Sequence, residues 1–435
     1  MLTAYAEQNA TRYHMPGHKG SGSGILSDIY PYDITELSFS DNLTNPNGVI
    51  DNAEKDLASL VGAKRSRILT GGSTLGVLVS VFAAKAYYKG EKSKLIICKS
   101  SHKSVYNILG LLGIEPIFLP EKIIDGLPFP DLNKLPELCD NGVIGALFTS
   151  PDYFGRCLDL EKISKILKQN GKLLIVDGAH GAHMPFVQPE LYAGRYSDIW
   201  VDGAHKTLKT LTQGALLCIN NTALLDYAEE GLSIFSTSSP NYLITGSVED
   251  GYKSFAELDK TLFEEVKKAK AVFGERLSRG YSMIKSDDIL KLCVDLHENA
   301  DGARMGEYLE KNNIYAELAA GRFLIFMLAP TFDYDSAKKL VELLNGYKES
   351  VKVSKIKNKE CAPKRALPYV MAKKCDFEFI DLKDAKGRIS AGEVGLFPPC
   401  FPLIVAGEVF DNRLIGELLN KNTFGIGNGK VKVVK

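Results

Sequence analysis

The chain has 435 residues, of which 45% are apolar and 24% charged. This is the composition of an ordinary globular protein, long enough for about three domains at ~150 residues each. Its 53 Lys and Arg balance its 53 Asp and Glu, so there is no overall field to recruit nucleic acid or an acidic membrane surface. Polyanion binding is disfavoured, and small-molecule chemistry stays open.

The N-terminal sequence has no apolar core of signal-peptide length. The most apolar stretch, Leu75–Ala84, is far shorter than the ~20 residues of a membrane span. Cysteines occur singly and without CxxC pairs, at positions 98, 139, 157, 218, 293, 361, 375 and 400. A disulfide framework is therefore not expected in a chain of this size. We expect reduced thiols and a cytoplasmic location.

From about residue 50 to 280, short apolar runs alternate with segments of helical periodicity. The predicted strands are Leu95–Cys98, Pro116–Leu119, Val143–Thr149, Leu173–Val176, Ile199–Val201 and Ala215–Ile219. The predicted helices include Thr74–Tyr88, Ser104–Leu112, Leu160–Gln169 and Ala223–Glu230. Strands that are apolar on both faces and separated by helices indicate a mostly parallel sheet that is covered on both sides. The predicted fold class is therefore α/β, with a doubly wound large domain.

The composition changes after a long helical region, Val248–Arg279. Residues 281–348 predict a small α/β unit, with the elements Lys291–Leu296, Gly302–Asn312, Phe323–Leu328 and Asp335–Leu344. The Lys-rich stretch Val351–Lys364 predicts a solvated connection to a compact terminal domain. We expect four parts, namely an N-terminal arm (1–48), a large domain (49–280), a small α/β domain (281–348) and a C-terminal domain (349–435).

Two segments at predicted strand ends or helix starts suit a phosphorylated, planar ligand. Gly72-Ser73-Thr74 opens a helix, and glycines with free helix N-terminal N–H groups favour an anion. The alternative is a simple N-cap. His102 follows a predicted strand, where it could stack on a planar heteroaromatic ring or be an ordinary capping or surface residue.

Two further segments supply a carboxylate and an amine. Asp177 follows a buried strand, where a carboxylate needs a cationic partner or several hydrogen-bond donors. A protonated pyridine nitrogen would be such a partner. Ala179 is small enough to lie against a ring face. The alternatives are a structural Asp or a metal site of Asp177, His180 and His183, but no second acidic cluster with ligand spacing supports the metal. Lys206 follows the next strand and suits a Schiff-base amine.

Together these segments resemble the Orn/Lys/Arg decarboxylases, a family of pyridoxal phosphate (PLP) enzymes of fold type I, in its bacterial biosynthetic branch. The resemblance covers essentially the whole chain. It is carried, in order, by Tyr13–Gly20, Asp33–Glu36, Asp41–Leu43, Gly72–Thr74, Ser150–Gly155, Asp177–Gly181, His205–Leu208 and Thr237–Tyr242.

The resemblance implies that residues 49–280 bind PLP and that Lys206 holds it as a Schiff base. Asp177 would pair with the pyridine nitrogen, and His102 would stack over the ring. The other residues of the implied cofactor site are Gly72, Ser73, Thr74, Ala179, His180 and His205, of which His205 would also serve in proton transfer. Ser238 and Ser239 would reach the phosphate of a neighbouring subunit, so at least a dimer is implied.

Three departures from the family pattern stand out. Gly203 and Ala204 replace hydroxyl residues, which removes donors from the phosphate site. Asp152 replaces a Thr and puts a new acid close to the expected cofactor. Counting back from Pro398-Pro399, the family's substrate-binding Glu falls on Gly392, and the acid has moved to Glu393. One step along a strand turns a side chain to the opposite face, so either local geometry rescues Glu393 or the cation contact is lost.

The resemblance favours decarboxylation of lysine, arginine or ornithine to the amine of a polyamine pathway. Gly392 and Asp152 favour an alternative, an aminotransferase or a decarboxylase of a non-basic amino acid. A non-catalytic descendant is a third possibility, against which the Lys206 and Asp177 pair argues. We expect no metal, no nucleic acid and no membrane partner.

Overall fold

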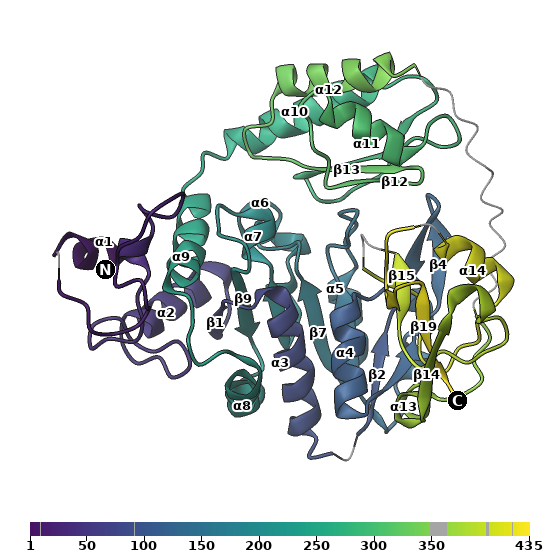
Figure 1. The fold of residues 1–435 in the computed structure, drawn as a ribbon, viewed down its shortest axis with the longest axis horizontal. Coiled ribbons are helices and arrows are strands. Elements are labelled where there is room, and N and C mark those ends of the chain that lie inside the picture. Colours follow the sequence, from purple (N-terminus) through teal and green to yellow (C-terminus); the bar gives the residue numbers. More distant parts are fainter. Residues whose placement is uncertain (9, 91, 349–362, 397–399, 420) are drawn as a thin grey trace. The chain divides into compact units, whose positions relative to one another are not determined.

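The structure, a computed structural model, describes residues 1–8, 10–90, 92–348, 363–396, 400–419 and 421–435. The chain divides into two compact units, which are described one at a time (Figure 1). The first unit contains residues 1–94, 139–150 and 159–257. The second contains residues 95–138, 151–158 and 258–435.

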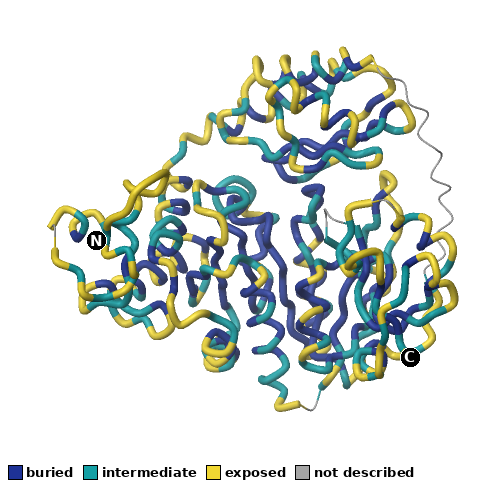
Figure 2. The backbone as a smooth tube through the Cα atoms, in the orientation of Figure 1, coloured by how far each residue is buried: buried dark blue, intermediate teal, exposed yellow. Residues whose placement is uncertain are grey.

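The centre of the first unit is its part of a seven-stranded sheet with the order β1-β9-β8-β7-β6-β2-β3. Its strands are β1 (Arg65–Leu69), β6 (Val143–Thr149), β7 (Leu173–Gly178), β8 (Ile199–Asp202) and β9 (Ala215–Ile219). The β6–β7 and β7–β8 pairs are parallel, whereas β9 runs antiparallel to both β8 and β1. The strands are almost entirely buried, as the dark blue tube shows (Figure 2). This confirms the predicted α/β class with a mostly parallel sheet.

Helices of the first unit accompany these strands. They are α1 (Leu2–Glu7), α2 (Val49–Val61), α3 (Gly72–Tyr87), α5 (Leu160–Gln169), α6 (Met184–Val187), α7 (Ala204–Thr207), α8 (Leu225–Phe235) and α9 (Tyr242–Ala256). Helix α3 lies very close to β8, because a Cβ added at Gly76 would be 2.3 Å from Cγ2 of Val201. Asp159 caps α5 by accepting a hydrogen bond from the Lys162 N–H at 2.9 Å.

Strand β1 was not predicted, because two arginines interrupt its apolar pattern. Arg67 is only 2% exposed and forms an ion pair with the buried Glu54 of α2 at 3.1 Å. Burial raises the pKa of Glu54 to about 7, against the opposing effect of Arg67. A buried arginine in a strand needs an acidic partner from another part of the fold, and the apolar periodicity of the strand does not reveal that partner.

The second unit begins with β2 (Lys94–Ile97, the first residue of which lies in the first unit), α4 (Lys103–Leu112) and β3 (Glu115–Phe118). A hairpin of β4 (Glu121–Ile124) and β5 (Leu127–Pro130) follows. Its turn residues, Asp125 and Gly126, have φ of 56° and 77°. The Asp-Gly sequence is a hairpin signal that the prediction overlooked.

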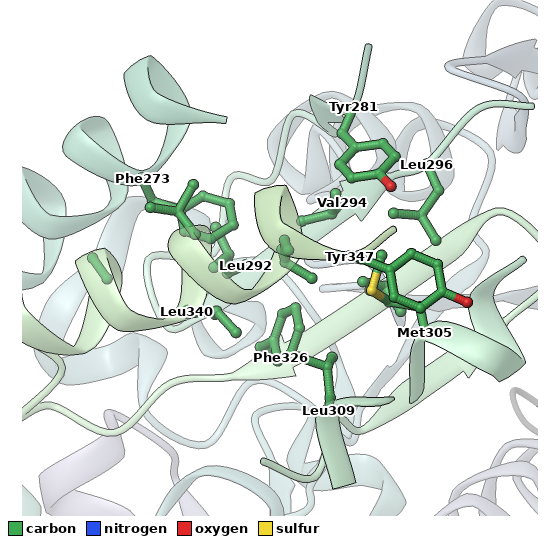
Figure 3. Close-up of a cluster of buried hydrophobic side chains, with 14 of the residues drawn as sticks. Phe273, Tyr281, Leu292, Val294, Leu296, Met305, Leu309, Phe326, Leu340 and Tyr347 are labelled. Carbon is green, nitrogen blue, oxygen red and sulfur yellow. The ribbon is translucent and has the colours of Figure 1, made fainter. Parts of the chain in front are cut away.

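Residues 258–348 form a four-stranded antiparallel sheet with the order β10-β11-β13-β12. Its elements are α10 (Thr261–Arg276), β10 (Ser282–Met283), β11 (Lys291–Asp295), α11 (Gly302–Glu310), β12 (Leu318–Ala320), β13 (Phe323–Met327) and α12 (Tyr334–Gly346). Figure 3 shows the apolar cluster between this sheet and its helices. Phe273 of α10 belongs to that cluster, so α10 packs with the residues that follow it. The predicted long helical region is accordingly two helices, α9 and α10.

The C-terminal part contains two three-stranded sheets, β14-β19-β18 and β16-β15-β17. Its elements are α13 (Tyr369–Lys374), β14 (Phe377–Asp381), β15 (Val394–Leu396), β16 (Pro402–Ile404), α14 (Asn412–Leu418), β17 (Thr423–Phe424), β18 (Ile426–Gly427) and β19 (Lys430–Val434). The predicted connection Val351–Lys364 lies outside the described residues except for its last two. No helix in the described parts of the chain has the length and apolar character to span a bilayer.

Candidate active site

The carboxyl ends of three parallel strands place Asp177 at the centre of one sheet edge. Asp177 pairs with Thr149 of β6 on one side and with Val201 of β8 on the other. It is 4% exposed, and Oδ1 accepts a hydrogen bond from the Ala179 N–H at 3.2 Å. Within the described residues it forms no ion pair. A buried carboxylate in this position suits a ligand that brings its own positive charge.

Lys206 lies on the short helix α7, directly after β8. Its Nζ is 3.1 Å from Nε2 of His180, which comes from the segment after β7. The two strand ends therefore bring the predicted amine and the predicted histidine into contact. This pair joins residues that are 26 positions apart in the chain.

Gly203, a departure from the family pattern, has a steric reason. A Cβ at this position would be 2.4 Å from the carbonyl oxygen of Ala179. The backbones after β7 and β8 thus approach so closely that the hydroxyl residue of the family does not fit without a shift. In this conformation position 203 has no room for a side chain that could donate to a phosphate.

His205 has a defined tautomer. Its Nδ1 is 2.9 Å from the carbonyl oxygen of Gly214, and a carbonyl oxygen only accepts, so Nδ1 carries the hydrogen. Burial lowers the pKa of His205, which favours the neutral ring. Nε2 is then the ring atom that can accept or return a proton.

The N-terminus of α3 carries the predicted phosphate site. Gly72 has φ of +70°, and a Cβ there would meet nothing within 4 Å. Its N–H donates to the carbonyl oxygen of Gln213 at 2.8 Å. The hydroxyls of Ser73 and Thr74 make no hydrogen bond within the described residues. Open space, two hydroxyl donors and helix N–H groups fit a phosphate.

These residues fit PLP on chemical grounds. The set contains an amine for the aldehyde carbon (Lys206), a buried carboxylate without an ion-pair partner among the described residues for the pyridine nitrogen (Asp177), and hydroxyl donors for the phosphate next to Gly72 (Ser73 and Thr74). All of them lie in the first unit.

The remaining predicted cofactor residues are placed as follows. His102 lies in the second unit and caps α4, where Nδ1 accepts a hydrogen bond from the Ser104 N–H at 3.2 Å and lies 2.8 Å from Ser104 Oγ. Its ring is therefore anchored through Nδ1. Ser238 and Ser239 are exposed in the loop before α9, so the predicted reach to a neighbouring subunit stays a prediction.

Asp152, a predicted substrate residue, makes contacts within its own turn. Its Oδ1 accepts from the backbone N–H groups of Phe154 and Arg156, both at 2.9 Å. Its Oδ2 pairs with the guanidinium of Arg156 at 2.7 Å. These bonds hold the carboxylate of Asp152 within its own turn and give it a structural role there.

Glu393, the other predicted substrate residue, is also paired. It accepts hydrogen bonds from the Tyr369 hydroxyl at 2.8 Å and from Lys373 Nζ at 3.1 and 3.2 Å. Burial and the neighbouring Glu393 raise the pKa of Tyr369, so this hydroxyl stays a donor. At Gly392, a Cβ would meet only Lys432, at 4.0 Å.

Two buried acids were not singled out in the sequence. Asp202, the last residue of β8, accepts hydrogen bonds from Tyr192 at 2.6 Å and Tyr252 at 3.3 Å. Burial raises its pKa to about 7. Glu408 pairs with Lys99. An acid within an apolar strand could have signalled Asp202, whereas no local pattern signals the pairing of Glu408 with a residue 309 positions away.

Metal binding was the alternative for Asp177, His180 and His183. Over the described ranges, no group of three His, Cys, Asp or Glu residues could hold a metal ion.

Comparison with known proteins agrees with this chemistry. The sequence pattern of "Orn/Lys/Arg decarboxylase, major domain" matches residues 1–291, and that of the family's C-terminal domain matches residues 330–422. An arginine decarboxylase of Bacillus subtilis is 25% identical, covering 98% of this chain and 93% of its own. The uncharacterized protein YaaO of the same organism is 26% identical, covering 99% and 96%.

The fold also has solved counterparts. The constitutive lysine decarboxylase of Escherichia coli superimposes with a TM-score of 0.79 at 18% identity, covering 100% of this chain and 81% of that one. This likeness supports a PLP enzyme fold of type I. With two family patterns matching most of the sequence, the chain belongs to the Orn/Lys/Arg decarboxylase family and is a PLP-dependent amino-acid decarboxylase.

Proposed function

We propose that this enzyme decarboxylates a basic amino acid (lysine, arginine or ornithine), releasing CO₂ and the corresponding amine of a polyamine pathway. The observation that carries this proposal is the chain-long similarity to arginine decarboxylases, of which the one from Bacillus subtilis covers 98% of this chain. The family's chemistry agrees with this proposal, and so do the amine of Lys206 and the carboxylate of Asp177.

The residues of the first unit have distinct tasks in this proposal. Bound PLP supplies an electron sink for the electron pair left when CO₂ departs. Asp177 would pair with the pyridine nitrogen and keep it protonated, and Ser73 and Thr74, in the turn that begins at Gly72, would hold the phosphate. Lys206 would hold the cofactor through its amine. His205 Nε2 or Lys206 Nζ would take a proton from the substrate's ammonium group and return it to Cα after CO₂ has left.

A second candidate is decarboxylation of a non-basic amino acid, or transamination. The ion pair between Glu393 and Lys373 favours it. A carboxylate that is already neutralised by a lysine has less affinity for a substrate cation than a solitary one. The vacant space at Gly392 agrees with the loss of that contact.

A substrate panel separates these candidates. The holoenzyme is incubated with each of the twenty amino acids and ornithine, while CO₂ and the amine product are measured. The proposal expects CO₂ from lysine, arginine or ornithine at a kcat/KM at least about tenfold above the others, a difference of ~1.4 kcal/mol. CO₂ from a non-basic amino acid instead would establish the second candidate. Transfer of the amino group to an added keto acid, without CO₂, would refute decarboxylation.

Lys206→Ala supplies the matched blank for that panel. We expect loss of the visible absorption band of the bound cofactor and a fall in CO₂ release of roughly 10³-fold or more. Lys209→Ala, three residues further on, is the control and should keep both. An unchanged band in Lys206→Ala would refute the assignment of this lysine.

We also propose a homodimer, or a larger assembly, with shared sites in the cytoplasm. The exposed Ser238 and Ser239 support sharing, and the cysteines that the structure describes are all free thiols. Mixing Lys206→Ala with Ser238→Asp subunits tests this, because shared sites would let mixed dimers regain activity that neither variant has alone. The absence of any recovery would argue for independent sites.

A further inference from the structure

A polar cleft lies in the first unit at the amino ends of the parallel strands, the edge of the sheet opposite to the one that carries Asp177. Its volume is about 340 Å³, and all of its lining residues belong to this unit. Asp198 directly precedes β8, and Asn220 directly follows β9, which runs antiparallel to β8. Lys64 directly precedes β1, the other neighbour of β9. The cleft is therefore separate from the candidate active site.

Three cations line this cleft, namely Lys64, Lys168 of α5 and Arg195. All three side chains belong to exposed residues. Among the described residues none of the three forms an ion pair, whereas Lys165, three positions before Lys168 on α5, pairs with Glu161. Since no acid of the described chain neutralises these cations, they can pair with an anion from solution.

The one acid that lines the cleft, Asp198, is used by the fold. Its Oδ2 accepts a hydrogen bond from the Leu174 N–H at 2.8 Å, and its Oδ1 accepts from Nδ2 of Asn221 at 3.1 Å. Its carbonyl oxygen accepts from the N–H groups of Asn220 and Asn221, at 2.9 and 3.0 Å. Asp198 thus ties the start of β8 to its neighbours, and the lining keeps an excess of two positive charges.

The uncharged part of the wall is ordered by its own hydrogen bonds. Ser197 Oγ donates to the carbonyl oxygen of Ala193 at 2.7 Å, and Asn220 Nδ2 donates to that of Gly194 at 2.7 Å. Thr222, the first residue of the short helix η6 (Thr222–Leu224), adds an exposed hydroxyl to the lining. A wall that is ordered before a ligand arrives loses little conformational entropy on binding.

We propose that this cleft is a binding site for a small phosphate-bearing molecule. The excess of two positive charges matches a phosphate group, which carries about −1.5 to −2 at pH 7, better than it matches a single carboxylate. Lysine and arginine both donate charge-assisted hydrogen bonds to phosphate oxygens. The volume suits a small ligand, because it lies near the lower end of the ~300–1,000 Å³ of ligand pockets. The site goes beyond the proposed function and does not depend on it.

The test is isothermal titration calorimetry of the holoenzyme with inorganic pyrophosphate as the probe, in a buffer without phosphate. Saturation with PLP keeps the candidate phosphate site at the start of α3 occupied. We expect saturable binding of one probe per chain. Lys64→Ala, Lys168→Ala and Arg195→Ala should each raise the dissociation constant about tenfold, because each removes a charge-assisted hydrogen bond. The midpoint of thermal unfolding (Tm) should stay the same, since these residues are exposed.

Two controls separate the cleft from the general charge of the protein. Lys209→Ala removes an exposed cation near the other edge of the sheet and should change the dissociation constant less than about twofold. Thr222→Glu places a negative charge in the lining and should abolish binding. Thr222→Gln has nearly the same size without the charge and should bind within about threefold of the unchanged protein.

The outcomes divide as follows. Saturable binding that is lost in Thr222→Glu and kept in Thr222→Gln and Lys209→Ala supports the site. A lack of saturable binding, or equal weakening in Lys209→Ala and Lys64→Ala, would refute it. Citrate that binds as tightly as pyrophosphate would refute the assignment to phosphate, because the cleft would then accept any multivalent anion.

Discussion

The strand ends of the first unit and the C-terminal part of the second unit bury acids and balance their charges in different ways. In the first unit, Asp177 and Asp202 end neighbouring parallel strands, are 4% and 0% exposed and form no ion pair within the described residues. In the second unit, Glu393 and Glu408 lie in the C-terminal part, and each is paired with a lysine. The same electrostatic problem, a carboxylate with little water around it, thus has separate solutions.

The difference shows how to distinguish a binding acid from a supporting one. An acid that is already neutralised by a lysine stabilises the fold, and its burial says little about ligands. Asp177 has no lysine partner among the residues that the structure describes, which suits the cation of the cofactor. Asp202 accepts hydrogen bonds from two tyrosines, and burial raises its pKa to about 7. Its carboxyl group therefore avoids a buried charge by binding a proton below that pH. Three substitutions of these acids test this division, and a fourth tests a strained backbone position in the C-terminal part.

Asp202→Asn should produce the largest change, in the pH dependence of stability. The folded-state pKa is raised from 3.8 to about 7, so the folded state binds more protons between these values. Stability is then greatest at low pH and falls as pH rises through this window, by an upper limit of about 4 kcal/mol. The neutral amide removes this fall. The measurement is Tm of both proteins from pH 4.5 to 8, and parallel curves would contradict the prediction.

Asp177→Asn should lower kcat/KM about 100-fold, because the amide carries no charge to hold the pyridine nitrogen protonated. Tm of the protein without cofactor should change little, since no protein cation loses its partner. Steady-state kinetics and thermal unfolding check the two statements. A large loss of stability with near-normal turnover would mean that Asp177 is a structural acid.

Glu393→Gln should lower stability and leave substrate binding nearly unchanged, which is the reverse of what Asp177→Asn should do. Loss of the buried pair with Lys373 lowers the free energy of unfolding by about 2 kcal/mol, whereas KM changes less than about threefold. Glu378→Gln is the control, because its pair with Arg388 is more exposed, at 43% and 35%, and should contribute less than ~1 kcal/mol. A KM raised tenfold or more at unchanged Tm would instead make Glu393 a substrate contact.

Cys400→Gly should have the smallest effect and raise stability. Cys400 has φ of 64°, in the left-handed region that glycine adopts without a steric penalty. The gain is partly offset by the larger entropy of glycine in the unfolded chain, which leaves about 0.5 kcal/mol. Cys400→Ala keeps the Cβ and should give no gain. Equal Tm values for the glycine and alanine variants would exclude backbone strain as the cause.

The sequence by itself determined the sheet-building strands from β6 to β9 and the residues at their carboxyl ends. Asp177 and Lys206 were predictable because buried strands are short apolar runs, and parallel strands bring their ends to one edge. The order of motifs along the chain determined the family. These are properties of local pattern and of chain order, which need no tertiary partner.

Only the tertiary structure decided which charges meet. β1 escaped prediction because Arg67 needs Glu54, and the roles of Glu393 and Glu408 depend on lysines brought from elsewhere in the chain. The sequence shows that Gly203 lacks a phosphate donor, and only the structure shows that a Cβ there would be 2.4 Å from the carbonyl oxygen of Ala179. Charge compensation and close backbone approach are set by distances between segments remote in sequence, and composition and periodicity carry no record of those distances.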